Sequence, residues 1–229
     1  VVSNFDGEIV QAWGNPNHVI LPRSSCKILQ ALPLVASGAA DSLGLTTRQL
    51  ALSCASHQGA EIHSNLVKSW LKDLGKTDDD FRCGSQWPRD TEARNAMIKN
   101  DETPCRYHNN CSGKHSGFLT LSAHLGAGPD YHLPEHPVQK AILNTFEEVI
   151  GETSPGYGID GCSAPNWACT IGGLARAMAR CAGNSSDILG LASVRLRNAM
   201  MAHPDLVAGE TRACTCLLYT SDAADEEDS

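Results

Sequence analysis

The stretch LPRSSCKILQALP, from Leu21 to Pro33, decides how the rest of the chain is interpreted. Its apolar residues have helical spacing, and Ser24 stands three residues before Lys27, so a helix that begins near Ser24 places both side chains on one face. Burial and the neighbouring charge of Arg23 would lower the pKa of Lys27, so that it could accept a proton from a serine hydroxyl near neutral pH. The stretch indicates a nucleophile beside its base, but a serine N-cap followed by a solvated lysine explains the same residues.

The composition is typical of a globular protein that binds neither nucleic acid nor a membrane. Hydrophobic residues make up 41% and charged residues 19% of the 229-residue chain, which excludes a disordered protein. The formal net charge is −8 and no basic run carries interleaved aromatics, so we expect no nucleic-acid partner. No apolar stretch is long enough to span a membrane, and no signal peptide is visible.

The ten cysteines form no C-x-x-C pair, which argues against a zinc ribbon or a thioredoxin-like site. Several of them, including Cys54 and Cys181, stand in apolar helical contexts. We therefore expect buried thiols in a reducing compartment and a cytoplasmic location.

The hydrophobic periodicity predicts a mainly helical chain with a modest sheet. We expect a hairpin over residues 1–15 and a strand over 157–160. The expected helices span residues 24–38, 46–54, 60–74, 90–98, 112–125, 137–150, 167–181 and 186–202. This order of elements predicts an α/β or α+β fold.

Residues 53–60, SCASHQGA, place a second hydroxyl, Ser56, beside His57 and a glycine turn. Backbone amides at residues 58–60 are expected to line a pocket for an anion or a carbonyl oxygen. An ordinary helix stop explains the same pattern.

Two later stretches carry thiols among polar groups. Residues 105–117 fail the phosphate-loop pattern at both ends, but Cys111 could bind a metal together with Cys162, His115 or a neutral Lys114. A buried thiol beside a hydrogen-bonded loop is the alternative. Residues 158–166 are expected to form a turn with Asp160 near its tip, where its carboxylate could serve a site. An aspartate that only forms the turn, beside a cysteine buried in the core, explains the same residues.

Six motifs in order resemble the thiol-rich L-asparaginase II family first found in rhizobia. They are P-R-S-x-x-K-x-L-Q-A-L-P, C-A-S-H-x-G, C-G, N-N-C-S-G-K-H-x-G, G-x-D-G-C-x-A-P and H-P-x-x-V-A-G, and they cover about Gly7 to Thr215. The resemblance implies hydrolysis of L-asparagine to aspartate and ammonia. It also implies a fold similar to the serine β-lactamases and glutaminases, with an antiparallel sheet flanked by helices, and a homodimer at full length.

The resemblance also implies roles for single residues. Ser24 matches the nucleophile, Lys27 its partner amine and Ser56 the second catalytic serine. The implied zinc ligands, whose ion supports substrate binding rather than delivering the nucleophile, are Cys111, Lys114 and Cys162, and the expected supporting residues are Arg23, His57, His115 and Asp160.

The chain departs from the family pattern in three places. Gln86 stands where the family has histidine, and the lysine that serves the second serine and a further site cysteine have no counterpart. We expect residues 1–215 to be an asparaginase II-like domain truncated at both ends, since the chain opens on Val1, and residues 216–229 to be a non-native acidic tail resembling translated adapter sequence. Such a fragment is expected to fold poorly or to be inactive.

Two other interpretations remain open. The S-x-x-K pattern also occurs in serine acyl-hydrolases of the β-lactamase or transpeptidase type, but their S-D-N and K-T-G companions are absent from this chain. A non-catalytic metal-binding or redox module built on Cys111 and Cys162 is the second.

Overall fold

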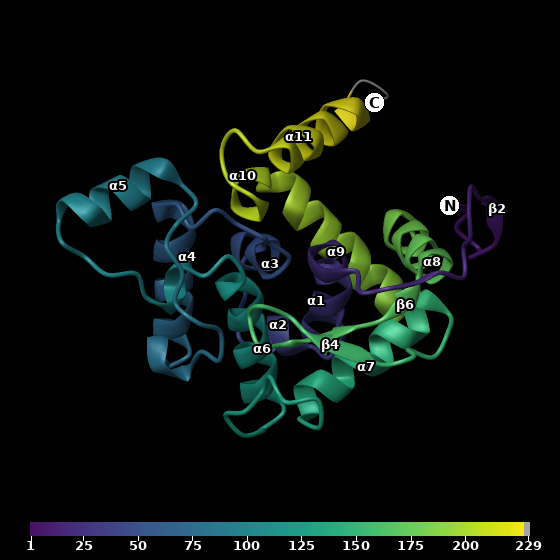
Figure 1. Cartoon of the computed structure of the whole chain (residues 1–229). Coiled ribbons are helices and arrows are strands. Elements are labelled where there is room, and N and C mark those ends of the chain that lie inside the picture. Colours follow the sequence, from purple (N-terminus) through teal and green to yellow (C-terminus); the bar gives the residue numbers. More distant parts are fainter. Residues whose placement is uncertain (227–229) are drawn as a thin grey trace.

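Helices carry most of the chain in the computed structural model, which describes residues 1–226 (Figure 1). They are α1 (Lys27–Ala36), α2 (Ala39–Ser42), α3 (Thr47–Ser53), α4 (Glu61–Asp73), α5 (Thr91–Lys99), α6 (Ser112–His124), α7 (Pro137–Ile150), α8 (Ile171–Ala182), α9 (Ile188–Ala202), α10 (Pro204–Val207) and α11 (Ala213–Glu226). Three short 3-10 helices are η1 (Arg23–Cys26), η2 (Asp78–Asp80) and η3 (Arg106–His108). The predicted acidic tail falls partly on residues 227–229, outside the described residues.

The strands form three separate antiparallel pairs within residues 1–226. These are β1 (Val2–Ser3) with β2 (Ile9–Gln11), β3 (Val19–Ile20) with β6 (Cys169–Thr170), and β4 (Tyr157–Ile159) with β5 (Pro165–Trp167). The predicted combination of helices and a modest amount of strand is confirmed. The expected continuous sheet is not formed by the described strands, so a β-lactamase-like fold stays a prediction.

Side-chain caps explain why most helices begin where the sequence predicts. Thr46 and Gln49 form a reciprocal capping box at α3, Asp90 caps α5, and Pro137 opens α7. The helix expected from residue 167 begins later, at Ile171, because residues 165–170 pair as strands and the Thr170 hydroxyl accepts a hydrogen bond from the third helical amide.

The first helix also differs from its prediction. Ser24 lies in the 3-10 turn η1, and the regular helix α1 begins only at Lys27. Pro33 lies inside α1 without ending it. Lys27 is therefore the first residue of the regular helix, one turn after Ser24.

The core lies where α1 packs against α6, α7 and α9, and α3 packs against α6 and α9. Leu29 and Leu32 of α1 are fully buried. Trp70 of α4 is also fully buried, and its indole N–H donates a hydrogen bond of 3.0 Å to Thr120 of α6. This packing brings the first turn of α1, the end of α3 and the start of α6 together in the middle of the molecule.

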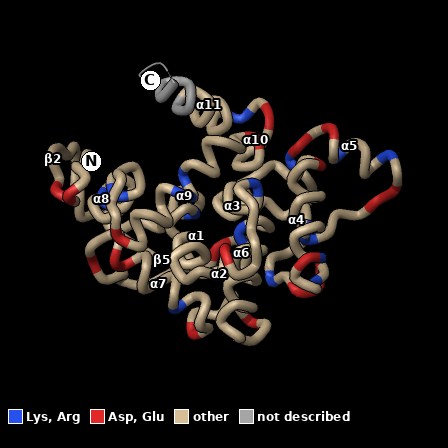
Figure 2. Tube along the Cα trace, turned by 180° about the vertical axis from the view of Figure 1, so that it is seen from behind, with Lys and Arg blue, Asp and Glu red and all other residues tan. Residues whose placement is uncertain are grey.

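No helix in the described residues is long and apolar enough to cross a bilayer. In Figure 2, lysine and arginine residues are interspersed with aspartate and glutamate along the trace.

Candidate active site

Ser24 is exposed at the surface end of η1, and its hydroxyl makes no hydrogen bond within residues 1–226. Arg23, directly before it, adopts a φ of 52°, which is uncommon for a residue with a side chain. Such backbone strain is concentrated at functional sites, where surrounding contacts hold it in place. The geometry therefore presents the Ser24 hydroxyl to solvent from a sharply turned backbone.

Lys27 is buried, with only 2% of its surface exposed. Its ammonium donates to the carbonyl oxygens of Ala55 and Asn110, the latter at 3.5 Å, and it hydrogen-bonds the Cys111 thiol. Burial lowers the pKa of Lys27 despite the opposing charge on Cys111. The hydrogen bond to Ser24 expected from the sequence is not formed, because the ammonium points inward to these three acceptors.

Ser56 follows Ala55 directly, so the Lys27 ammonium lies beside the backbone of the second serine. The Ser56 Oγ is buried and has no hydrogen-bond partner among the described residues. A buried hydroxyl without a partner is costly in a folded protein, which is a reason to examine it as part of a site.

His57 is buried and uses both ring nitrogens within the protein. Its Nδ1 accepts a hydrogen bond of 3.1 Å from Gly59 N, so Nε2 carries the proton and donates to Ser112 Oγ at 3.0 Å. Burial lowers the pKa of His57 well below its ordinary value, with a smaller contribution from the charge of His63. The neutral ring thus connects the Gly59 turn to the first turn of α6.

The expected anion pocket at residues 58–60 is not open at two of its three amides. Gln58 N donates to Ala208 O at 2.9 Å, and Gly59 N donates to His57 Nδ1. That prediction is wrong for these two groups, because other parts of the protein already satisfy them.

The two cysteines predicted as metal ligands do meet. Cys111 at the start of α6 and Cys162 after β4 share a hydrogen bond, and Lys114 Nζ donates to Cys162 Sγ at 3.2 Å. The bond from Cys162 lowers the pKa of Cys111 well below its ordinary value, with help from the charges of Lys27 and Lys114. The same bond and burial raise the pKa of Cys162. The pair therefore shares one thiolate between two lysines.

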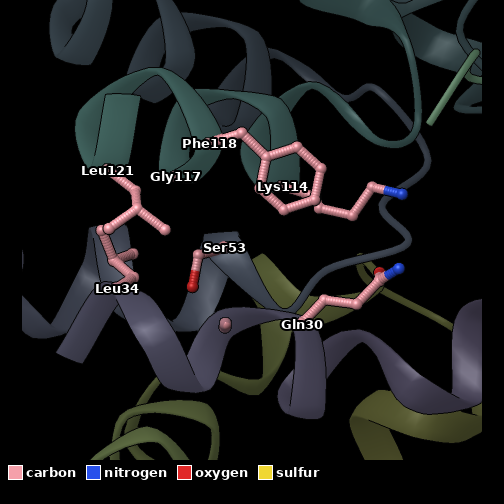
Figure 3. A pocket seen from close by; sticks show the side chains of 8 residues that line it. Gln30, Leu34, Ser53, Lys114, Gly117, Phe118 and Leu121 are labelled. Atoms are coloured by element: carbon pink, nitrogen blue, oxygen red, sulfur yellow. The ribbon is translucent and has the colours of Figure 1, made fainter. Parts of the chain in front are cut away.

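Lys114 is buried, and burial by itself disfavours its ammonium form. The negative charge of the thiol pair outweighs burial, so the pKa of Lys114 lies above its ordinary value. Figure 3 shows Lys114 and Gln30 extending toward the same end of a cavity of about 10 Å³, away from Leu34 and Leu121. The Gln30 Oε1 is buried without a protein partner, so this end of the cavity is polar.

His115 lies one residue beyond Lys114 and is fully buried among Phe81, Phe118 and Tyr131. Its Nδ1 lies 2.8 Å from the Tyr131 hydroxyl, which in turn accepts a hydrogen bond of 2.8 Å from Arg82 N. The Tyr131 hydroxyl therefore donates to Nδ1, and the buried Nε2 has no partner among the described residues. Burial, with the charge of Lys114, lowers the pKa of His115 well below its ordinary value.

Arg23 and Asp160 form a salt bridge of 2.9 Å beside Ser24, although they are 137 residues apart in sequence. The Asn166 side chain accepts a hydrogen bond of 3.3 Å from Arg23 N. These three residues line a surface cavity of about 150 Å³ together with Leu21, Gly158, Ile159 and Gly161. The site thus offers a cation, a carboxylate and an amide in one small cavity.

The structure therefore brings the predicted residues into one region, where Lys27 links the Ser56 segment to the thiol pair. Sequence reasoning missed Tyr131, which stands in none of the quoted stretches, and gave no role to Asn166 at the end of residues 158–166. Gln86 was noted only as a departure from the family pattern, and its Oε1 accepts a hydrogen bond of 3.4 Å from Asn110 N.

The model of the L-asparaginase II family matches residues 1–224 of the chain. The chain belongs to the L-asparaginase II family. Membership in the L-asparaginase II family implies an amidohydrolase that acts on a small molecule. No curated protein matches the chain. The family match extends past Cys216, and the predicted non-native origin of residues 216–229 stays a prediction.

Proposed function

We propose that this protein hydrolyses the side-chain amide of L-asparagine to give L-aspartate and ammonia by serine-based acyl transfer. The observation that carries the proposal is the position of the Lys27 ammonium, buried beside the backbone of Ser56 and one turn after Ser24. Lys27 is thus near both serine segments and in hydrogen-bond contact with the thiol pair.

In the proposed reaction a serine oxygen, Ser24 or Ser56, attacks the carboxamide carbon and transfers its proton to a lysine. Breaking the C–N bond releases ammonia and leaves an acyl ester on the serine, and water then hydrolyses this ester. A buried lysine with a lowered pKa favours this transfer, because its neutral form is more accessible near neutral pH. Arg23 and Asp160 offer partners for the α-carboxylate and α-amino groups of the substrate.

The two thiols fit a zinc ion in chemistry, and Lys114 joins them as a ligand only after it loses the proton that the thiol charge holds on it by raising its pKa. Cys111, Lys114 and Cys162 converge through mutual contacts, and one thiol is already ionised near neutral pH. Among the side chains that the structure describes, those of residues 1–220, no cluster of three or more His, Cys, Asp or Glu donors occurs, so such a site depends on a neutral Lys114. A bound zinc would supply positive charge that supports substrate binding, and the protein residues hold and orient it.

Substitution of each serine tests the proposal. Ser24→Ala and Ser56→Ala are compared with Ser25→Ala, a neighbouring serine whose hydroxyl donates to Pro22 O at 2.7 Å. Ammonia release is measured with asparagine and with glutamine, beside hydrolysis of the β-lactam nitrocefin. We expect the first two variants to lose ammonia release and Ser25→Ala to retain it.

Three outcomes would redirect the assignment. Nitrocefin hydrolysis without ammonia release would favour a β-lactamase-like enzyme. Zinc binding without either activity would favour a metal-binding or redox module. Asparagine turnover unchanged in both serine variants would exclude the serine mechanism. A homodimer and a cytoplasmic location are further parts of the proposal, tested by light scattering of the purified protein and by cell fractionation.

A further inference from the structure

The segment His203–Gly209, here called the clamp, forms a quoted motif that the proposed chemistry does not use. It follows α9 and includes α10. Its carbonyl oxygens face the second serine: Val207 O accepts from Ser56 N at 3.0 Å, and Ala208 O accepts from Gln58 N at 2.9 Å. These two hydrogen bonds hold the backbone on both sides of His57.

The clamp is itself held along its length. His63 Nε2 donates to Asp205 O at 3.0 Å, and the Thr47 hydroxyl lies 2.9 Å from His203 Nε2. Leu206, Val207 and Ala208 are buried in the core. The Ser56 backbone therefore docks on a segment that is fixed by packing and by hydrogen bonds at its start and middle.

Thr215, in the first turn of α11, closes the other end of the clamp. It is 7% exposed, and its hydroxyl lies 2.6 Å from Gly209 O and 3.3 Å from Pro204 O. The hydroxyl donates to the nearer oxygen and so ties Gly209, the last residue of the clamp, to the first turn of α11. Gly209 has a φ of 120° and approaches the Gln58 side chain so closely that an added Cβ would collide with it.

We propose that Thr215 is a positioning residue that acts through the clamp to hold the Ser56 hydroxyl for reaction. The inference rests on the proposed function, because it assigns Ser56 a part in the chemistry. Loss of the Thr215 hydroxyl leaves the buried Gly209 O without its donor, so the turn loosens and Val207 O and Ala208 O move from the Ser56 segment. A small displacement of a reacting group is enough to slow catalysis.

The test compares Thr215→Val, which keeps the shape and removes the hydroxyl, with Thr215→Ser, which keeps the hydroxyl. Thr220→Val is the matched control, since Thr220 lies on the same helix and donates only to Leu217 O, at 2.9 Å. Three quantities are measured for each variant: hydrogen exchange of the Ser56 and Gln58 amides, kcat and KM for asparagine, and zinc content.

In Thr215→Val we expect the Ser56 and Gln58 amides to exchange at least about 10-fold faster than in the parent protein. We expect kcat to fall by about 10- to 100-fold, with KM and zinc content unchanged. Thr215→Ser and Thr220→Val should match the parent protein. If Thr215→Val does not fold, Thr47→Val is used instead, because it removes the exposed hydrogen bond to His203 at the start of the clamp. We expect it to speed exchange of the same two amides and to lower kcat, each by less than Thr215→Val would.

The inference is overturned if exchange and kcat in Thr215→Val, or in Thr47→Val when that variant replaces it, equal those of Thr220→Val. It is also overturned if the Ser56 and Gln58 amides exchange faster while kcat stays unchanged, because the clamp then has only a structural role. Absence of asparagine turnover in the parent protein would instead refute the proposed function, and the amide exchange alone would still decide whether Thr215 holds the Ser56 backbone.

Discussion

Lys27 donates a hydrogen bond from its ammonium to the carbonyl oxygen of Ala55, the residue directly before Ser56. The same ammonium contacts Asn110 O and the Cys111 thiol, so one buried cation joins the ends of three segments distant in sequence. A surface lysine could not do this, because water would compete for each acceptor. The Lys27 ammonium therefore connects the segment of the second serine with the start of the thiol segment.

Replacement of Lys27 by methionine should remove the proton acceptor and leave the buried Ala55 carbonyl and the half-buried Asn110 carbonyl without the donor that Lys27 supplies. We expect ammonia release to fall at least about 100-fold and the free energy of unfolding to fall by about 1–3 kcal/mol. The control is Lys140→Met, since Lys140 pairs with Glu135 at 3.3 Å on the surface. Urea denaturation and an ammonia assay measure both effects, and full activity of Lys27→Met would exclude Lys27 as the base.

Removal of the Arg23 side chain should weaken substrate binding more than it affects stability. The Arg23 side chain is 69% exposed, so its salt bridge with Asp160 contributes little to the free energy of unfolding. We expect Arg23→Ala to raise KM for asparagine by about 10-fold or more. Arg195→Ala, which breaks a surface pair of 2.7 Å with Asp41, is the control and should leave KM unchanged. Equal KM values in the two variants would contradict this role.

If Cys111 and Cys162 bind zinc, replacing one of them should remove the metal, whereas replacing a cysteine elsewhere should not. Cys111→Ser should abolish zinc binding in equilibrium dialysis, because a serine hydroxyl is not ionised near neutral pH. Cys54→Ser is the control. Burial raises the pKa of the Cys54 thiol to about 12, so this thiol stays protonated and does not act as a metal ligand. Equal zinc content in both variants would show that the metal, if bound, uses other donors.

Gly113 marks the closest approach between α6 and α3. A Cβ at this position would collide with the Leu52 carbonyl and side chain, whereas one at Gly117 of the same helix would lie 3.3 Å from a Leu34 methyl group. We expect Gly113→Ala to lower the free energy of unfolding by about 3 kcal/mol and Gly117→Ala by less than about 1 kcal/mol. Urea denaturation measures both free energies of unfolding. A larger loss in Gly117→Ala than in Gly113→Ala would contradict this packing of α6 against α3.

Acid should destabilise the protein through its buried neutral histidines. Burial lowers the pKa of His57, His63 and His115 below the ordinary value of 6.5. Below about pH 6.5 the unfolded chain therefore binds protons that the native protein does not, and the free energy of unfolding falls as pH falls, by up to about 1.4 kcal/mol per pH unit for each histidine. The loss continues down to the native pKa values.

Urea denaturation at pH 7, 6 and 5 measures this slope, and His57→Asn should make it shallower. Asparagine keeps an amide that can replace one ring hydrogen bond, so the variant is expected to fold. An identical slope in the parent protein and in His57→Asn would show that His57 titrates normally in the native state.

Local sequence predicted the elements whose ends carry their own signals. Pro137 at the first position and Gly151 after the last residue bound α7 as expected, and the Thr46 capping box starts α3. The boundary at Ile171 was missed because the pairing of residues 165–170 with β3 and β4 depends on strands distant in sequence. Propensity within one window cannot report such pairing.

For the candidate site, the sequence by itself determined the residue types, their order and the L-asparaginase II family: serines, a lysine and two cysteines stand in the motifs from which the chemistry is proposed. Only the tertiary structure decided the contacts. It turned Lys27 away from Ser24 toward Ala55, joined Cys111 to Cys162, and placed the clamp against Ser56. The reason is physical: a buried ammonium, thiol or amide must bond to whatever acceptor the packing brings near, and that packing joins segments as far apart as Ser56 and Val207, which are 151 residues apart.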